Sequence, residues 1–295
     1  MAIVGTVAAC GATPAAQVTP TPSASPKALT LAAATPPDPG GEVGSASGEF
    51  ESPAEMAVWN RLNLTEGHLN RLSTLEITGG QLKLVPKTST WFDGFRGPLV
   101  YQELAGDIVL HTRVKAEGSK GGRPKQKFSL GGAMLRVPGS DAKPNWLSVT
   151  VGTGDTPGRV EVKETLNGSS KPQELPVKDG WVELVLARSG PVVVAFYKEE
   201  GGAWKVGRRW LRPDLAEVEV LQWGVTAYTD WDSLGTLKKD AAKANTTEIK
   251  GRPDLKLSVD FVRFLRPRLP EGVDAMNPAA VPDDVLIKAL TPAGA

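Results

Sequence analysis

Between residues 75 and 265 the chain alternates apolar and polar residues with a period of two, in short runs separated by Gly, Pro, Asn and Asp. A period of two is the spacing of side chains on one face of a β-strand, whereas an amphipathic helix needs a period of about 3.6. Over residues 108–114, for example, Leu110 and Thr112 share one face. We therefore expect an all-β protein with many short strands and no amphipathic helix in this region.

Tight turns connect several of these runs. Residues 75–78 and 81–85 flank two glycines, and residues 181–187 and 191–197 flank an Arg-Ser-Gly turn, so both pairs are predicted β-hairpins. About eleven strands with short connections favour one antiparallel two-sheet sandwich or jelly roll over two small domains. The polar interval 233–253 is expected to be a loop or a short helix between the last two strands.

The first ten residues are apolar and small, and they end in Val7-Ala8-Ala9-Cys10. This arrangement resembles a bacterial lipobox, in which small residues precede a cysteine that becomes lipidated. The stretch is too short to span a bilayer and has no positively charged start, which leaves room for a start upstream of Met1 or a truncation. We expect lipidation at Cys10 of an exported protein; the alternative is an incidental free cysteine.

The segments on both sides of the strand-rich region differ from it in composition. Residues 11–48 are rich in Ala, Thr, Pro, Ser and Gly, which predicts a disordered tether. The sandwich is expected over residues 49–270. Residues 271–295 are rich in Pro and Ala and are expected to form a disordered tail with one helical turn near residues 283–290.

Charge and cysteine content exclude some classes of protein. The chain carries 34 Lys and Arg against 33 Asp and Glu, a net charge of +1, so no global field favours nucleic acid as a partner. Cys10 is the single cysteine, so no disulfide can form within the chain. The expected domain of roughly 220 residues must therefore be stabilised by its core, for which that length is sufficient.

Five segments, in the same order along the chain, resemble bacterial concanavalin A-like domains of the LamG-like and DUF1349-like kind. They are LVYQELAGDIVL at 99–110, GAMLR at 132–136, GWVEL through GGAW at 180–204, QWGVTA at 222–227 and VDFVRF at 259–264. The resemblance covers about residues 91–265. It implies a jelly roll with a concave face, in a family whose members often have accessory or surface roles related to carbohydrate.

The sequence gives little support for catalysis. Retaining glycosidases need two carboxylates about 5–5.5 Å apart, and the Glu-x-Asp-x-x-Glu signature of laminarinases is absent. On the strand face that carries Glu161, the next residue is Lys163 and not a second carboxylate. The two histidines, His68 and His111, have no metal-binding spacing, and no Gly-x-Ser-x-Gly motif occurs. We therefore expect no catalytic residues.

No cofactor is expected, with calcium kept open as a weak possibility. Asp230 and Asp232 place two carboxylates in a predicted loop. Calcium takes 6–8 oxygen ligands, so these residues would supply only part of a site. Ordinary turn chemistry of Asp is the simpler interpretation.

The aromatic residues indicate carbohydrate binding. Sugars stack their apolar faces on aromatic rings, and polar side chains nearby exchange hydrogen bonds with the hydroxyls. Trp146 shares a strand face with Ser148, and we expect Trp223 and Trp231 to lie on one side of the long strand and its exit. The alternative is that these rings pack in the core. The candidate binding residues are Trp146, Trp223, Trp231, Tyr228, Gln102, Arg136 and Gln222.

The leading hypothesis is a non-catalytic lipoprotein, anchored through Cys10 in the periplasm or on the cell surface, whose lectin-like sandwich binds carbohydrate on its concave face. A second hypothesis is a structural protein that docks another envelope component. A third is an undetected glycoside hydrolase or lyase. The expected partner is thus a carbohydrate or an envelope component.

Overall fold

The structure is a computed structural model that describes residue 2 and residues 41–267 and 277–292. Within these ranges, strands form two antiparallel seven-stranded sheets. The front sheet has the order β1-β4-β13-β6-β7-β8-β9, and the back sheet has the order β12-β11-β10-β5-β14-β3-β2. The predicted all-β sandwich is thereby confirmed. Cys10, residues 11–40 of the predicted tether, and residues 271–276 and 293–295 of the predicted tail lie outside the described residues.

The strands of the front sheet are β1 (Asn60–Arg61), β4 (Leu99–Ala105), β13 (Val220–Tyr228), β6 (Ser129–Arg136), β7 (Trp146–Thr153), β8 (Pro157–Leu166) and β9 (Ser169–Pro176). Those of the back sheet are β12 (Lys205–Leu211), β11 (Val192–Glu199), β10 (Val182–Ser189), β5 (Val109–Glu117), β14 (Lys256–Leu265), β3 (Leu82–Pro86) and β2 (Leu72–Ile77). Both hairpins predicted from the sequence are present, as β2–β3 and β10–β11.

The main core lies between the two sheets. Alternate residues of each strand point into it, as the period of two requires. In the front sheet, Leu135 and Trp223 lie opposite one another on this inner face, and Leu110 and Leu186 do so in the back sheet. These side chains are fully buried, so the hydrophobic effect holds the sheets together.

The β9 strand is one element that the sequence pattern missed. It is polar, contains two prolines and pairs only with β8 at the edge of the front sheet. Proline is tolerated at an edge because its missing N–H faces away from the neighbouring strand. An edge strand of this composition shows no apolar alternation.

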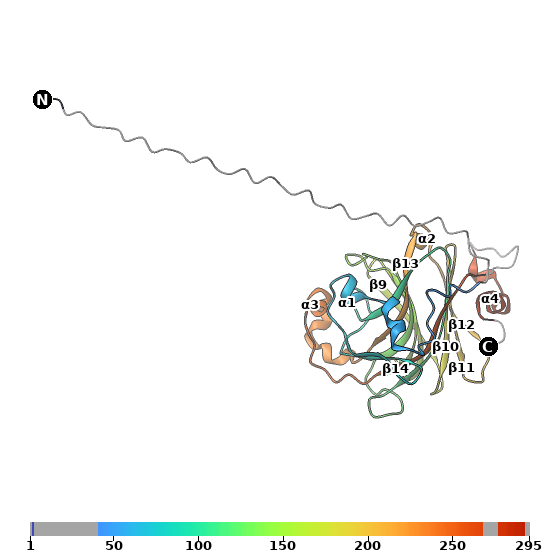
Figure 1. Ribbon diagram of the computed structural model, residues 1–295, viewed down its shortest axis with the longest axis horizontal. Helices are drawn as coiled ribbons and strands as arrows, with labels where there is room; N and C mark the ends of the chain where they lie inside the picture. Colours follow the sequence, from blue (N-terminus) through green and yellow to red (C-terminus); the bar gives the residue numbers. More distant parts are fainter. Residues whose placement is uncertain (1, 3–40, 268–276, 293–295) are drawn as a thin grey trace. The chain divides into compact units, whose positions relative to one another are not determined.

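Short helices and loops cover the outer face of the front sheet, on the side away from the back sheet. They include α1 (Leu62–Thr65), the 3-10 helix η2 (Trp231–Lys239) and α3 (Ala241–Thr246). Most of η2 and all of α3 lie in the interval 233–253, for which a loop or a short helix was predicted. Figure 1 shows α1 and α3 on one side of the sandwich and α4 (Asp283–Leu290) on the other. The remaining short helices are η1 (Pro53–Val58), α2 (Pro213–Ala216) and η3 (Pro278–Ala280).

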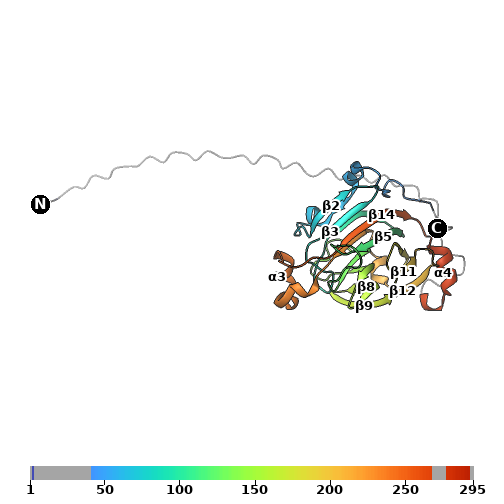
Figure 2. The ribbon, with the colours of Figure 1, turned by 90° about the horizontal axis from the view of Figure 1, so that it is seen from below.

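Both ends of the described chain contact the back sheet. Glu42 and Gly48 form bridges to β14, so pairing begins before residue 49, where the sandwich was expected to start. Helix α4 buries Leu286 and Leu290 against the outer face of β10 and β11. Figure 2 shows α4 beside β11 and β12. None of the helices in the described ranges combines the length and the apolar character needed to cross a bilayer.

Candidate functional site

A loop, here called the strap (residues 88–98), crosses the outer face of the front sheet. The indole N–H of Trp91 donates to Thr226 Oγ1 of β13 at 2.9 Å, and the Trp91 ring meets Trp146 of β7 edge-on at 5.7 Å. At the edge of the sheet, the amide of Ser170 in β9 donates to Asp93 Oδ1 at 2.8 Å. The strap is thus attached to the interior strand β13 and to the edge strand β9, on either side of β6, β7 and β8.

A pocket of about 150 Å³, here called the front pocket, lies beside the strap over β8. Two strap residues, Thr90 and Phe92, line one wall, and Trp231 of η2 lines another. Phe92 and Trp231 are half-buried, so their rings are partly accessible from solvent. The remaining lining residues are Phe128, Glu161, Lys163 and Pro172.

A buried charge pair forms part of the pocket wall. The ammonium of Lys163 donates to Glu161 Oε1 at 2.5 Å, and the hydroxyl of Tyr228 donates to the same oxygen at 2.8 Å. The side chains of Lys163 and Glu161 are only 2% and 1% exposed. Burial and the neighbouring Glu161 carboxylate hold the pKa of Tyr228 well above its usual range, so Tyr228 remains a neutral donor.

The sequence of β8 explains why this pair faces the pocket. Val160 and Val162 point into the core between the sheets, so Glu161 and Lys163 must point to the outer face. There they lie beside Trp146, whose ring is 5.6 Å from the Lys163 Nζ. The strand thus brings a carboxylate and an ammonium under a cover of aromatic rings.

The Trp231 side chain is held in place by its neighbours. Its ring packs edge-on against Phe92 at 5.9 Å and Phe95 at 5.4 Å, and Lys238 Nζ lies 5.2 Å from the ring centre. A ring fixed in this way loses little conformational freedom when a ligand packs against it. Trp231 is the predicted sugar-binding residue that the structure places at the front pocket wall.

The other predicted aromatic residues have no exposed ring face. Trp146 and Tyr228 lie on the outer face of the front sheet, but the strap and its surroundings cover them completely. Trp223 points into the core between the sheets, so the expectation that it shares a side with Trp231 is wrong. The alternation ends at Asp230, whose backbone has a φ of 65° and turns the chain into η2.

The predicted polar residues are bound to other protein groups. Arg136 donates to both oxygens of Glu66, at 2.7 and 2.8 Å, and to Gln222 Oε1 at 2.6 Å. Both Arg136 and Gln222 are almost fully buried. Gln102 is half-buried and donates to the carbonyl of Val58. These three residues therefore stabilise the covering loops and do not line the front pocket.

Asp230 and Asp232, the two candidate calcium ligands, have different surroundings in the structure. Asp230 is buried and accepts hydrogen bonds from Thr88 Oγ1 and the amide of Arg252, whereas Asp232 is exposed and pairs with Lys238. In the described part of the chain, the group of side chains with the spacing of metal ligands lies elsewhere. It consists of Glu66, His68 and Asp141. Arg136 and Arg96 already neutralise these carboxylates.

Glu161, Lys163, Phe92 and Phe128 were not among the predicted binding residues. The alternation of β8 does place Glu161 and Lys163 opposite the core valines. However, a Glu and a Lys two positions apart are also typical of a solvated strand face. The outer face of β8 is enclosed because the strap covers it, and the strap is distant from β8 in the sequence.

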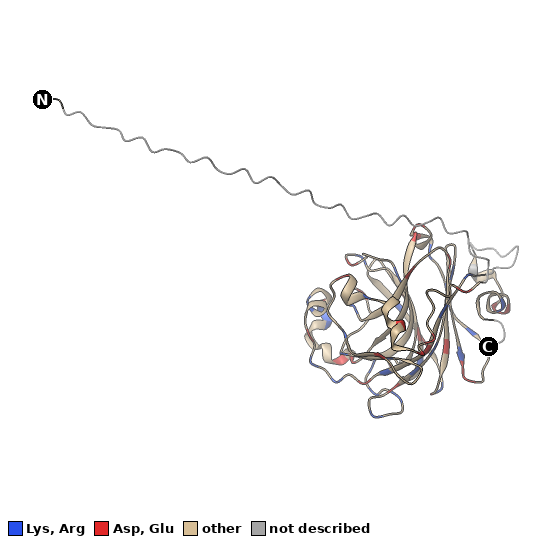
Figure 3. Cartoon of the chain, in the orientation of Figure 1, with Lys and Arg blue, Asp and Glu red and all other residues tan. Residues whose placement is uncertain are grey.

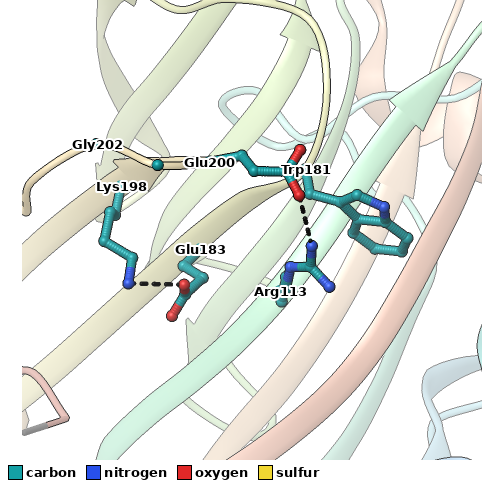
Figure 4. A pocket seen from close by; sticks show the side chains of 7 residues that line it. Arg113, Trp181, Glu183, Lys198, Glu200 and Gly202 are labelled. Carbon is teal, nitrogen blue, oxygen red and sulfur yellow. Dashed lines mark hydrogen bonds and ion pairs between the residues drawn. The ribbon is translucent and has the colours of Figure 1, made fainter. Parts of the chain in front are cut away.

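A second pocket of about 410 Å³, the back pocket, lies on the outer face of the back sheet. Figure 4 shows Arg113 beside Trp181 and the ion pairs Arg113–Glu200 and Lys198–Glu183. The Arg113 guanidinium lies 4.7 Å from the centre of the Trp181 ring. The back pocket is thus lined by paired charges and one aromatic ring that a cation already covers.

Charges over the rest of the sandwich are also mixed. In Figure 3, the blue Lys and Arg and the red Asp and Glu are interspersed over the sandwich. Lys127 pairs with Asp155 at 2.7 Å and Arg123 pairs with Asp179, which neutralises part of a Lys- and Arg-rich loop. The distribution agrees with the absence of a global field expected from the net charge.

The ion pairs of the back pocket predict a specific acid sensitivity. Burial raises the pKa of Glu183, but hydrogen bonds from His111 and Lys198 outweigh this and lower it from 4.5 to about 2. A depressed pKa contributes stability above pH 4.5, which is lost as the pH falls through 2. The free-energy difference between wild type and Glu183→Gln should therefore shrink from about 3 kcal/mol at pH 7 toward zero near pH 2.

Urea unfolding at several pH values measures this difference. The matched control is Glu76→Gln, a change at an exposed residue of β2, which should leave the free energy of unfolding nearly unchanged at pH 7. A Glu183→Gln difference that stays constant between pH 7 and pH 2 would contradict the assignment.

No family model and no curated protein matches this chain. Among solved structures, the GH43 protein BlXynB from Bacillus licheniformis has a TM-score of 0.52 at 12% identity, over 75% of this chain and 39% of that chain. The kappa-carrageenase from Pseudoalteromonas carrageenovora, solved with an oligotetrasaccharide, has a TM-score of 0.47 at 10% identity, over 81% and 99%. A lectin from Bauhinia forficata in complex with GalNAc has a TM-score of 0.44 at 11% identity, over 76% of this chain and 98% of that chain.

At 12% identity, the similarity to BlXynB establishes the fold alone. The protein is a concanavalin A-like jelly-roll sandwich. Because this chain spans 39% of BlXynB, nothing is carried over from the activity of that whole protein. The more specific resemblance to LamG-like or DUF1349-like domains stays a prediction.

Proposed function

We propose that this protein is a non-catalytic, exported lipoprotein that binds carbohydrate in the front pocket. The observation that supports the proposal is the combination of partly accessible rings, Phe92 and Trp231, with a carboxylate and an ammonium in the same pocket. Rings stack on the apolar face of a sugar, while Glu161 accepts and Lys163 donates hydrogen bonds to hydroxyls. Lipidation at Cys10, and a location in the periplasm or on the cell surface, rest on the sequence motif.

The composition of the pocket favours binding over hydrolysis. Hydrolysis with retention needs a second carboxylate about 5–5.5 Å from the first. Among the described residues that line the front pocket, Glu161 is the only carboxylate. It is engaged by Lys163 and Tyr228, which leaves it poorly placed to act as a general acid.

A glycan array probed with the whole chain, followed by titration of the best ligand, tests this function. Trp231→Ala should weaken the affinity at least about tenfold, because it removes a ring from the pocket wall. The matched control is Trp181→Ala, which removes a similarly half-buried ring near a cation in the back pocket and should leave the affinity unchanged. Equal losses in both variants would contradict the assignment.

Two outcomes would support the other hypotheses. If no glycan binds and one envelope protein is repeatedly recovered with the chain, the docking hypothesis is favoured. If reducing sugar is released and the release is lost in Glu161→Gln, the protein is a hydrolase.

A further inference from the structure

The volume of the front pocket limits the size of what it can hold. It measures about 150 Å³. Pockets for drug-sized ligands measure about 300–1,000 Å³, whereas a cavity of about 150 Å³ holds one benzene-sized ring. The front pocket therefore has room for one six-membered ring.

The strap prevents a sugar chain from continuing across the sheet. Trp91 is 1% exposed and packs between Thr226 and Trp146, so it fills the space over β7 and β13. Beyond it, Arg136 joins Glu66 of the loop after α1 to Asp141 of the β6–β7 loop. A ligand in the front pocket thus meets a wall of protein on the side toward the middle of the sheet.

The open side of the pocket lies at the edge of the front sheet. Pro172 of β9 is exposed and Trp231 is half-buried, so a ligand can enter between them. On β9, Ser170 is already joined to the strap through Asp93. A sugar ring can therefore enter from the edge, but the rest of its chain must remain outside.

The charges of the pocket select against an ionised sugar. Glu161 and Lys163 neutralise each other, and at the rim Lys238 pairs with Asp232 at 2.9 Å. Neighbouring hydroxyls of a neutral ring can donate to Glu161 and accept from Lys163 at the same time. A uronate would compete for Lys163 and leave the buried Glu161 without its counter-ion, which is costly.

From this geometry, and resting on the proposed function, we propose that the front pocket binds the terminal ring of an uncharged glycan end-on. The rest of the glycan extends into solvent past Pro172. An internal stretch of polysaccharide, which would need an open groove, does not enter.

Calorimetric titration of the unmodified protein tests the inference. The probes are the monosaccharide, disaccharide, tetrasaccharide and hexasaccharide of the best array ligand, the same tetrasaccharide with either terminal ring O-methylated, and its uronic acid counterpart. Affinities from monosaccharide to hexasaccharide should agree within about threefold, and methylating the bound end should weaken binding at least about tenfold. The uronic acid counterpart should also bind at least about tenfold more weakly.

Each contrary outcome has a separate meaning. An affinity that rises about tenfold or more from disaccharide to hexasaccharide, with methylated ends tolerated, overturns end-on binding and leaves carbohydrate binding intact. Tighter binding of the uronic acid counterpart overturns the preference for an uncharged ring. If no glycan binds, the proposed function fails and the inference fails with it.

Discussion

Replacing Lys163 with Met is expected to lower the free energy of unfolding by about 3–5 kcal/mol. Lys163 is the counter-ion of Glu161, and both side chains are at most 2% exposed. The variant would leave a carboxylate in a nearly water-free site with only the Tyr228 hydroxyl as a partner. Urea unfolding followed by circular dichroism measures the loss.

Two variants separate loss of the charge pair from general damage. Lys127→Met removes the partner of Asp155 in an exposed pair and should leave the free energy of unfolding nearly unchanged. The double change Glu161→Leu with Lys163→Met removes both charges and should recover most of the lost stability. If the single Lys163→Met variant is as stable as Lys127→Met, the pair is not buried as described.

The second large effect is expected at the strap. Trp91→Ala should cost about 3–5 kcal/mol, because Trp91 is 1% exposed and fills the space over β7 and β13. Opening the strap also exposes Trp146, so the tryptophan emission should move to longer wavelength. Urea unfolding and the emission spectrum of the native state measure the two consequences.

The size of the substituted side chain provides the control. Trp91→Phe keeps most of the apolar contact with Trp146 but loses the hydrogen bond to Thr226 Oγ1, and should cost about 1–2 kcal/mol. A Trp91→Ala variant with unchanged stability and unchanged emission would show that the strap does not lie on the sheet. The front pocket would then lose one of its walls.

The fold could be predicted from the sequence because it depends on a local pattern. The period of two marks each strand, and the Gly-rich turns mark hairpins such as β2–β3 and β10–β11. The pairing register is also constrained, because a one-residue slip would move every core side chain of a strand to its other face. The polar edge strand β9 could not be predicted from this pattern, because the sheet buries little of it.

The site could be predicted only in part because it depends on contacts between distant segments. The sequence shows which residues of β13 share a face, but not which of its two faces the second sheet covers, and this decides the position of Trp223. The strap has no periodic pattern that would predict its path across the sheet. Without it, Glu161 and Lys163 are indistinguishable from a solvated pair, and the enclosure of Trp146 cannot be foreseen.

The central claim is that carbohydrate binds in the front pocket. The indole resonances in a two-dimensional nitrogen-15 spectrum test it most directly. The chain has eight tryptophans, and the resonance of Trp231 is assigned by its disappearance in Trp231→Phe. Titration with the best array ligand should shift the Trp231 indole resonance and leave that of Trp181, in the back pocket, unchanged. A shift of Trp181 with Trp231 unchanged, at saturating ligand, would contradict the account.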